Sequence, residues 1–224
     1  LALLGLFPWE YVPTIPSEVI LIGKWFHVNF HDMSNWTRSM LVPLSIINHF
    51  KPTRRLDRFT LHELYREGFH ERDLLIPPDP DRLSLRNFFL WLDTLHKFVE
   101  NNHLRPFRKL ALKKAEKWML ERFEGSGGLA AIFPAMLNSL IALKALGYAD
   151  DHPQVLRAER ELKRLEHETE DSVRIEPCLS PVWDTAIVAI CLHESGIPSD
   201  HPALKKCCDW LINKEIRFKG DWIY

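Results

Sequence analysis

Two histidines and an aspartate are the first side chains in this sequence whose spacing is suited to chemistry. His27 and His31 stand four residues apart, with Asp32 beside the second, and on a helix this spacing would place two imidazoles on one face as metal ligands. The prolines and β-branched residues of segment 7–32 predict an extended, turn-rich stretch instead, and no third ligand is evident. No metal site is expected.

Glycines and cysteines offer two further patterns, and neither carries chemistry. Gly125, Gly127 and Gly128 lack the Gly-Lys-Ser/Thr and the preceding strand of a phosphate-binding loop. The four cysteines show no paired spacing of a zinc site or a disulfide framework, and adjacent cysteines such as Cys207 and Cys208 form strained bridges. This cysteine usage fits a reducing compartment.

The composition favours a protein that handles apolar material. Of the 224 residues, 46% are hydrophobic and 26% are charged, which excludes a disordered chain. Thirteen phenylalanines and eight tryptophans give more aromatic surface than a helical domain of this size needs. The net charge of −1 provides no long-range attraction to nucleic acid. No apolar run approaches the length of a membrane-spanning helix.

Periodic apolar residues predict the helices that must position any site. One helix is expected from Trp36 to Phe50, with a kink at Pro43, and another over 85–99. Further helices are expected at 108–123, 134–147, 153–167, 182–195 and 202–214. The chain opens on Leu1 without the basic residues of a signal peptide, so we expect an internal piece of a longer protein.

A repeat with an offset of 49 residues organises the second half of the chain. LIALKALGYADDHP at 140–153 matches AICLHESGIPSDHP at 189–202, which aligns Gly147 with Gly196. Each copy combines an apolar helix stopped by glycine, an aspartate suited to an N-cap, a proline allowed in the first turn, and a second helix. This repeated αα-hairpin is compatible with an open solenoid or a closed α/α barrel.

Segment 85–122 has two interpretations. The helix at 85–99 carries Leu90 and Trp91 off its main apolar face, and residues 97–122 hold eight basic against three acidic side chains. The pair fits an amphipathic element that enters a bilayer surface beside anionic head groups. A core helix next to a solvated helix explains the same pattern.

A proline-rich segment at 177–186, PCLSPVWDTA, places Asp184 in the first turn of an expected helix, where a carboxylate stabilises the helix N-terminus. This segment resembles a signature of the squalene-hopene cyclases. Four more stretches are similar to proteobacterial-type members of that family, in the same order: LFPWEYVPTIPSEVILI at 6–22, DMSNWTRSMLVPLS at 32–45, HLRPFRKLALKKAEKWMLERFEGSGGLAAIFPAMLNSLIAL at 103–143 and LGYADDHP at 146–153. The resemblance covers essentially the whole chain.

The resemblance implies an all-α fold, in which repeated αα-hairpins build two α/α barrels that this chain covers in part. Residues 1–177 would belong to the inserted barrel, with its membrane-facing helix, and residues 178–224 would begin the main catalytic barrel. In the family's repeat a glutamine and a tryptophan tie helix ends together. Glu215 and Phe123 stand where that glutamine is expected, and both departures weaken the bracing.

The resemblance also implies an acid-initiated cyclisation of squalene to hopene and hopanol, without a cofactor. The acid, an Asp-x-Asp-Asp motif, lies beyond this span, so no catalytic residue is expected within it. A migrating carbocation must be kept from water, and aromatic faces stabilise it without trapping it. The residues similar to the family's substrate cavity are Trp36, Trp183, Ile132, Phe133, Pro134, Ser180 and Asp184, and those similar to its entrance channel are Met33 and Leu41.

Members of the family are monotopic, which implies a peripheral membrane protein on the cytoplasmic side of a bacterial inner membrane. The expected partners are squalene, the lipid bilayer and, at full length, a second copy of the chain. The residues expected to face the membrane are Phe88, Phe89, Trp91 and Leu92.

Three other functions are compatible with parts of this sequence. An oxidosqualene cyclase shares the architecture but carries a different acid motif, and the segments AIFPAM and PCLSPVWDT argue against it. A helical-repeat scaffold would present a polar or groove-like concave face to a protein partner. A prenyltransferase subunit with the same type of barrel should show zinc ligands, and none is visible.

Overall fold

The described chain is mainly helical. The computed structural model describes residues 1–27, 29–56, 58–64, 74–123 and 127–217. Its α-helices are α1 (Asn35–Phe50), α2 (Leu85–Asn101), α3 (Arg108–Glu121), α4 (Phe133–Ala145), α5 (Pro153–Lys163), α6 (Pro181–Glu194) and α7 (Pro202–Ile212). Two short strands, β1 (Glu166–Glu168) and β2 (Val173–Ile175), form an antiparallel hairpin.

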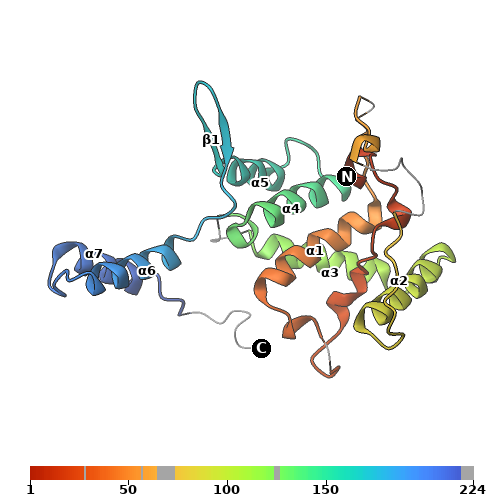
Figure 1. Ribbon diagram of the computed structural model, residues 1–224, viewed down its shortest axis with the longest axis horizontal. Coiled ribbons are helices and arrows are strands. Elements are labelled where there is room, and N and C mark those ends of the chain that lie inside the picture. The colour runs from red at the N-terminus through yellow and green to blue at the C-terminus, as the bar shows by residue number, and fades with distance from the viewer. Residues whose placement is uncertain (28, 57, 65–73, 124–126, 218–224) are drawn as a thin grey trace.

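The core lies where four helices meet. α1 packs against α3 and α4, and α4 packs against α5 (Figure 1). Each helix contributes a side chain with no exposed surface, namely Ile46, Met119, Leu143 and Val155. Because burying such a side chain is worth about 1.5–3 kcal/mol, this four-helix contact stabilises the described part of the chain by several kcal/mol.

The N-terminal segment has the extended, turn-rich form that its prolines predict. Short 3-10 helices interrupt it, among them η3 (Ser17–Leu21) and η4 (Phe30–Asp32). η3 packs on α3, and the buried Phe30 ring meets the Trp118 ring edge to face, with 5.6 Å between ring centroids. The described part of segment 7–32 therefore packs along the helices and contributes Ile20 and Phe30 to the core.

A side-chain cap defines the start of α1, and a left-handed residue defines its end. The Ser34 hydroxyl accepts from the Thr37 N–H at 3.1 Å and caps the helix N-terminus. At the other end Lys51 adopts a left-handed conformation with φ 48°. The buried Pro43 lies inside the helix, which continues past it to Phe50.

The predicted repeat is confirmed as two helix pairs with the same turn. Gly147 and Gly196 both have φ 94°, and each follows the last turn of its helix. The expected aspartate caps are wrong by one residue. The N-caps are His152 and His201, whose Nδ1 atoms each accept a backbone N–H at 3.2 Å. A proline at the first helical position fixes the preceding residue as the cap, and here that residue is histidine.

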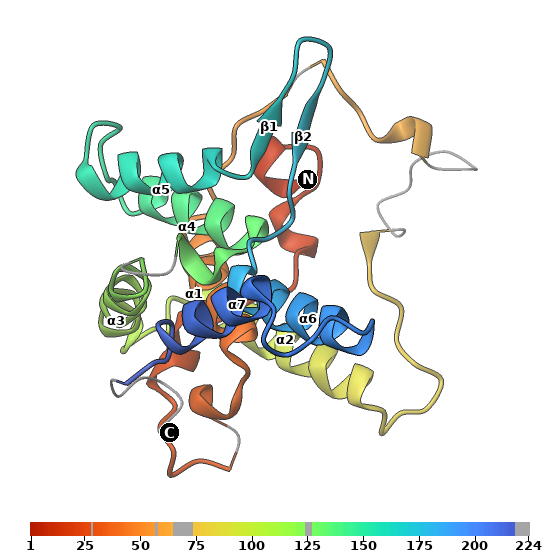
Figure 2. The ribbon, with the colours of Figure 1, turned by 90° about the vertical axis from the view of Figure 1, so that its left-hand side faces the viewer.

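The helix expected over 153–167 is shorter than predicted. α5 ends at Lys163, the next residues turn through the buried Leu165, and the chain then forms the β1–β2 hairpin. Figure 2 shows this hairpin projecting from the helices. Its tip is closed by Thr169, whose N–H donates to the Ser172 carbonyl at 2.8 Å. The run of charged residues gave no period-2 apolar pattern from which to predict the strands.

α6 and α7 form a pair that stands apart from the other helices (Figure 1). No residue of α6 is buried, and Leu204 is the buried residue of α7. Phe123, at a position expected to brace helix ends, is buried, and its carbonyl accepts from Arg157 Nη2 at 2.7 Å. Trp222, which belongs to the other copy of that motif, lies outside the described residues.

Replacing Gly147 should destabilise the α4–α5 turn through its backbone alone. A Cβ at this position would meet nothing within 4 Å, but the φ of 94° is unfavourable for L-residues. We expect Gly147→Ala to cost about 1 kcal/mol, and Gly147→Asn to cost less, because asparagine tolerates positive φ. Hydrogen exchange of α4 and α5 in the full-length protein measures both effects. Equal losses for the two variants would contradict the backbone explanation.

Candidate functional site

Two segments far apart in the sequence are joined by backbone hydrogen bonds. Ile132 and Cys178 form an isolated antiparallel bridge. On either side of it, the Phe133 N–H donates to the Pro177 carbonyl at 2.9 Å and the Leu179 N–H donates to the Ala131 carbonyl at 3.0 Å. We call this contact the 132–178 junction. It brings the start of α4 next to the segment that leads into α6.

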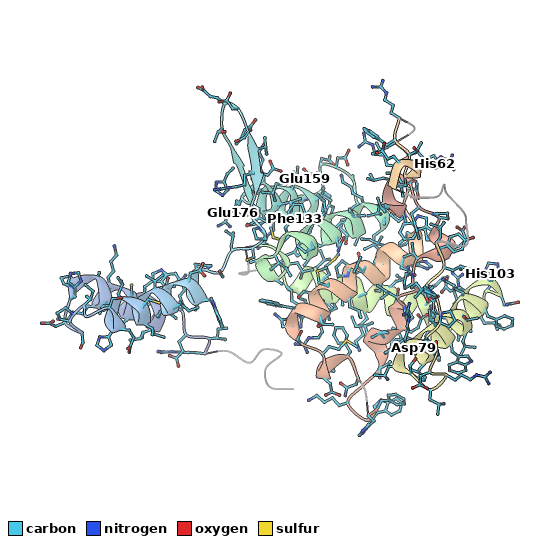
Figure 3. The ribbon with its side chains drawn as sticks, viewed as in Figure 1. His62, Asp79, His103, Phe133, Glu159 and Glu176 are labelled. Atoms are coloured by element: carbon cyan, nitrogen blue, oxygen red, sulfur yellow. The ribbon has the colours of Figure 1, made fainter. Side chains whose placement is uncertain are left out.

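Figure 3 shows Phe133 at the beginning of α4, with Glu176 beside it where the hairpin returns. Ile132 and Phe133 are half-buried, and Pro134 is exposed in the first turn of the helix. Ile132 also packs against the core. The core and the junction therefore hold Ile132 and Phe133 in place. Both residues keep some exposed surface, as Pro134 does, and another part of the protein is able to pack there.

The loop that leads into the junction has an unusual backbone. Gly128 has φ 96°, and a Cβ there would lie 2.6 Å from Met136 Cε. Ala130 and Ala131 adopt the left-handed region with φ 57° and 52°, which is uncommon for residues other than glycine. Such strain persists only where the surrounding structure imposes it. Here the junction and the buried Leu129 hold the loop in place.

The start of α6 combines a tryptophan with a hydrogen-bonded hydroxyl and carboxylate. The Ser180 hydroxyl donates to Asp184 Oδ2 at 2.8 Å, and the Asp184 N–H donates to the Ser180 carbonyl at 2.8 Å. Asp184 lies in the first turn, where its charge favours the helix dipole. Trp183 is 69% exposed. The carboxylate is thus fixed in orientation while the indole is open to its surroundings.

The expected residues of α1 fall into two groups. Trp36 lies in the first turn of the helix and is 68% exposed. Met33 and Leu41 are half-buried, and Leu41 packs against the core. Since both indoles are about two-thirds exposed, Trp36 and Trp183 do not belong to the core of the described fold. A water-free chamber around them requires additional chain.

α2 presents an aromatic surface. Phe88, Phe89 and Trp91 are 51–63% exposed, and the Phe88 ring contacts both other rings, at centroid distances of 5.6 and 6.4 Å. Leu92, expected to face the same way, is half-buried and lines a groove together with Phe89. No residue of α2 is buried. No helix in the described part of the chain is both long and apolar enough to cross a membrane.

Polar contacts, which the sequence did not reveal, attach α2 to the N-terminal segment. Asp93 accepts from the backbone N–H of Thr14 at 2.7 Å and from its hydroxyl at 2.6 Å, and it pairs with Lys97 at 2.7 Å. Burial would raise the pKa of Asp93, but the hydrogen bonds from Lys97 and Thr14 outweigh burial and lower that pKa. The charged form of Asp93 therefore holds the helix in place.

Arg108, at the start of α3, is the centre of a second attachment. Its side chain is 8% exposed, and it pairs with Glu18 of η3 at 2.8 Å and with Glu100 of α2. Arg105 pairs with Glu100 at 2.9 Å, and the His49 ring lies 2.9 Å from Arg108 Nη1. Burial works against the charge of Arg108, but its bonds to the two carboxylates raise its pKa.

Because a guanidinium can only donate, His49 Nδ1 must accept from Arg108. Burial first, and then the charge of Arg108, lower the pKa of His49. Burial also lowers the pKa of His96, although Glu100 lies 3.6 Å from its ring. Both histidines are therefore neutral in this cluster at neutral pH. Arg108 and its partners lie up to 90 residues apart in the chain. No spacing pattern in the sequence therefore predicts this cluster.

The paired helices and the comparisons together define the protein class. Residues 1–171 match the family model described as the squalene-hopene cyclase N-terminal domain, and residues 179–224 match the C-terminal domain of the same family. The fold is part of an α/α-barrel terpene cyclase. The chain belongs to the squalene-hopene cyclase family.

Curated relatives agree with this assignment. The chain is 37% identical to the dammaradiene synthase of the fern Dryopteris crassirhizoma, with 96% of this chain and 31% of the relative covered. It is 35% identical to the squalene–hopene cyclase of Zymomonas mobilis (100% and 35% covered) and 33% identical to that of Alicyclobacillus acidocaldarius (99% and 34% covered). The chain thus spans about a third of the length of these relatives.

Acidification should loosen the attachment of α2. His49 and His96 have lowered pKa values in the folded protein, so the unfolded chain binds more protons and stability rises with pH. The two neutral histidines contribute their full share of the folding stability above the usual histidine pKa of 6.5, and this share is lost as the pH falls below that value. We expect α2 in the full-length protein to exchange amide hydrogens faster at about pH 5.5 than at about pH 7.5, after correction for intrinsic rates.

Replacing His96 by glutamine should remove part of this pH dependence, because glutamine does not titrate. The pKa values of Asp93 and Glu18 are also lowered, but these carboxyl groups titrate at a lower pH. Their contribution to stability therefore does not change between about pH 5.5 and about pH 7.5. Protection of α2 that is identical at both pH values would show that the two histidines do not control the attachment.

Proposed function

We propose that this chain is part of an enzyme that cyclises squalene to hopene and hopanol by protonation and carbocation migration. The observation that carries the proposal is the match of both family domains in order along the chain. Relatives named squalene–hopene cyclase support squalene as the substrate. The proton-donating aspartates belong to a part of the protein beyond this span, so this chain supplies wall residues and no acid.

The proposed domain boundary lies at residues 177 and 178. Residues 1–177 form part of the inserted α/α barrel, and residues 178–224 begin the main catalytic barrel. The N-terminal family match ends at residue 171 and the C-terminal match begins at residue 179, so the boundary lies between them. The position of α6 and α7 apart from the other helices in Figure 1 also supports it. The 132–178 junction connects the two parts.

The proposed substrate wall is built around the 132–178 junction. Ile132, Phe133 and Pro134 line it from the α4 side, and Trp183 lines it from the α6 side. Trp36 contributes a second indole from α1, which packs on both η7 (Leu129–Ala131) and α4. The further chain of the full-length protein covers these exposed side chains and excludes water. Inside such a chamber the aromatic faces attract a cation without forming a bond to it.

Two polar residues and two apolar residues complete the proposed site. Ser180 and Asp184, which hydrogen-bond to each other at 2.8 Å, place a fixed carboxylate near the wall. Its negative charge would favour a nearby cation or support the donor acid. Met33 and Leu41 border the entrance channel for the substrate, where their partial burial makes them suitable as a narrow apolar passage.

We also propose that the full-length protein is a homodimer bound peripherally to the cytoplasmic side of a bacterial inner membrane. The aromatic residues of α2 enter the interface, and the exposed lysines of α3 lie beside anionic head groups. The support is that Phe88, Phe89 and Trp91 expose large rings for which the described chain has no core position.

One relative supports a second candidate reaction. The fern protein named dammaradiene synthase is as similar to this chain as the bacterial cyclases are. Analysis of the hydrocarbon products made from squalene by the full-length protein decides between the two reactions. The scaffold and prenyltransferase interpretations lose their basis, since the chain belongs to a cyclase family.

Replacing Trp183 by leucine should impair cyclisation, because a ring that faces the cation is lost. A cation–π contact in a desolvated site is worth about 2 kcal/mol, so the rate should fall roughly 30-fold or the products shift to incompletely cyclised ones. Trp183→Phe should retain most of the activity. Trp25→Leu, at an 84% exposed position outside the proposed wall, is the control. An unchanged rate and product ratio in Trp183→Leu would exclude Trp183 from the wall.

Replacing Phe88, Phe89 and Trp91 together by serine should weaken membrane binding of the full-length enzyme. Each buried ring contributes about 1.5–3 kcal/mol, so binding to vesicles should fall by at least about 100-fold and more protein should stay soluble without detergent. The matched control replaces Val173 and Ile175 of the hairpin, which are also exposed and apolar. Equal effects of the two sets in a vesicle co-sedimentation assay would contradict a specific role for α2.

A further inference from the structure

A groove runs between α2 and the N-terminal segment. One part of about 500 Å³ and another of about 330 Å³ share four lining residues, Pro16, Val19, His96 and Val99, and therefore form one continuous groove. Its combined size lies within the range of about 300–1,000 Å³ that is typical of ligand sites. α2 also lines it with Phe89, Leu92 and Leu95.

The groove exists because α2 is held by polar contacts instead of by apolar packing. The Asp93–Thr14 bonds fix the middle of the helix, and the Glu100–Arg108 pair fixes its C-terminal end. Between these two points the helix buries no residue. The apolar side chains of Leu92 and Val99 therefore face open space that another apolar molecule is able to fill.

The charges along the groove select the kind of molecule. Glu18 pairs with Arg108, Arg105 pairs with Glu100, and Asp93 pairs with Lys97. Each charged side chain of the wall thus has a partner of opposite sign within the protein. An ion in the groove would lose its hydration without gaining a free counter-charge. A neutral hydrocarbon chain has no charge whose hydration is lost, and burial of its apolar surface in the groove favours binding.

The groove is also continuous with the aromatic surface of α2. Phe89 lines the groove and is 63% exposed, and Leu95 lines it and is 45% exposed. A chain that lies against the outer rings of α2 can therefore pass into the groove without crossing a polar barrier. The source of hydrocarbon on that side of the helix is the bilayer.

We propose that the groove takes up one acyl chain of a membrane phospholipid when the enzyme is bound to a bilayer. This inference rests on the membrane association proposed above. The acyl chain lies between α2 and segment 13–22 and supplies the apolar contact that α2 lacks. The lipid then contacts α2 through its exposed rings and, inside the groove, through Leu92 and Val99.

Photolabelling of the full-length enzyme on phosphatidylcholine vesicles tests this proposal. The probe is a phosphatidylcholine that carries a diazirine in the middle of one acyl chain, and mass spectrometry of peptides locates the labelled positions. We expect label at Val19, Leu92 and Val99, in addition to label at Phe88 and Trp91. Val19 decides the outcome, because it lines the groove from η3 and a lipid that only touches the rings of α2 does not reach it.

The matched variants are Val99→Trp, which fills the groove, and Phe88→Trp, which changes the outer surface. We expect Val99→Trp to lower labelling of Val19 about tenfold, a loss equivalent to about 1.4 kcal/mol of binding, while vesicle co-sedimentation stays unchanged. Phe88→Trp should leave the labelling of Val19 unchanged. If Val99→Trp does not fold, Leu92→Gln serves instead, because a polar side chain in the groove disfavours the acyl chain.

The outcomes separate this inference from the functions on which it rests. Vesicle binding with label confined to Phe88 and Trp91 overturns the acyl-chain site and leaves membrane association intact. Label in the groove from a diazirine-bearing squalene, but not from the phospholipid, also overturns it. A lack of vesicle binding overturns both the site and the membrane proposal. Conversion of squalene in detergent then reports separately on the proposed cyclase activity.

Discussion

The attachment of α6 and α7 to the rest of the described structure depends on the short backbone contact between residues 131–133 and 177–179. These few hydrogen bonds tie the last helix pair to the helical core, and their amide and carbonyl groups must be satisfied because the loop has left regular helix. The strained backbone at Ala130 and Ala131 is the local cost of that pairing. Ile132 and Phe133 of the proposed wall take part in this contact, and Ser180 follows it directly in the chain.

A second constraint separates the core from α2. The core helices are joined by apolar packing, whereas α2 is joined to the body by carboxylates, guanidinium groups and a threonine. Apolar packing is insensitive to pH, while ion pairs and neutral histidines depend on it. The element proposed to meet the membrane is therefore also the element whose attachment responds to its chemical surroundings. Its aromatic side chains Phe88, Phe89 and Trp91 do not pack in the core.

Much of the fold was predictable from the sequence, and the reasons are local. The helices at 36–50, 85–99 and 134–147 followed from apolar periodicity, and the matching glycines at 147 and 196 revealed the repeated pair. The β1–β2 hairpin was missed because its strands are exposed and charged. The histidine caps were assigned to the neighbouring aspartates, because residue type favours aspartate and the exact first turn is set by the proline.

Motifs in the sequence pointed to two segments of the candidate site, PCLSPVWDTA and AIFPAM. The structure joins these segments by the 132–178 junction, and their role as a substrate wall stays a prediction. The partners of Arg108 were not predictable, since Glu18 and Glu100 come from separate elements and share no spacing rule with it. Long-range ion pairs of this kind depend on tertiary packing that a single sequence does not encode in any short pattern.

The two helix pairs share more than their composition. Each has a glycine at the same φ of 94° and a histidine cap at the same distance of 3.2 Å, although one pair is buried in the core and the other stands apart. A unit that keeps its internal geometry in such different surroundings behaves as an interchangeable building block. The turn of each pair is therefore set by its own glycine and histidine, so the α6–α7 pair keeps this geometry without support from the core.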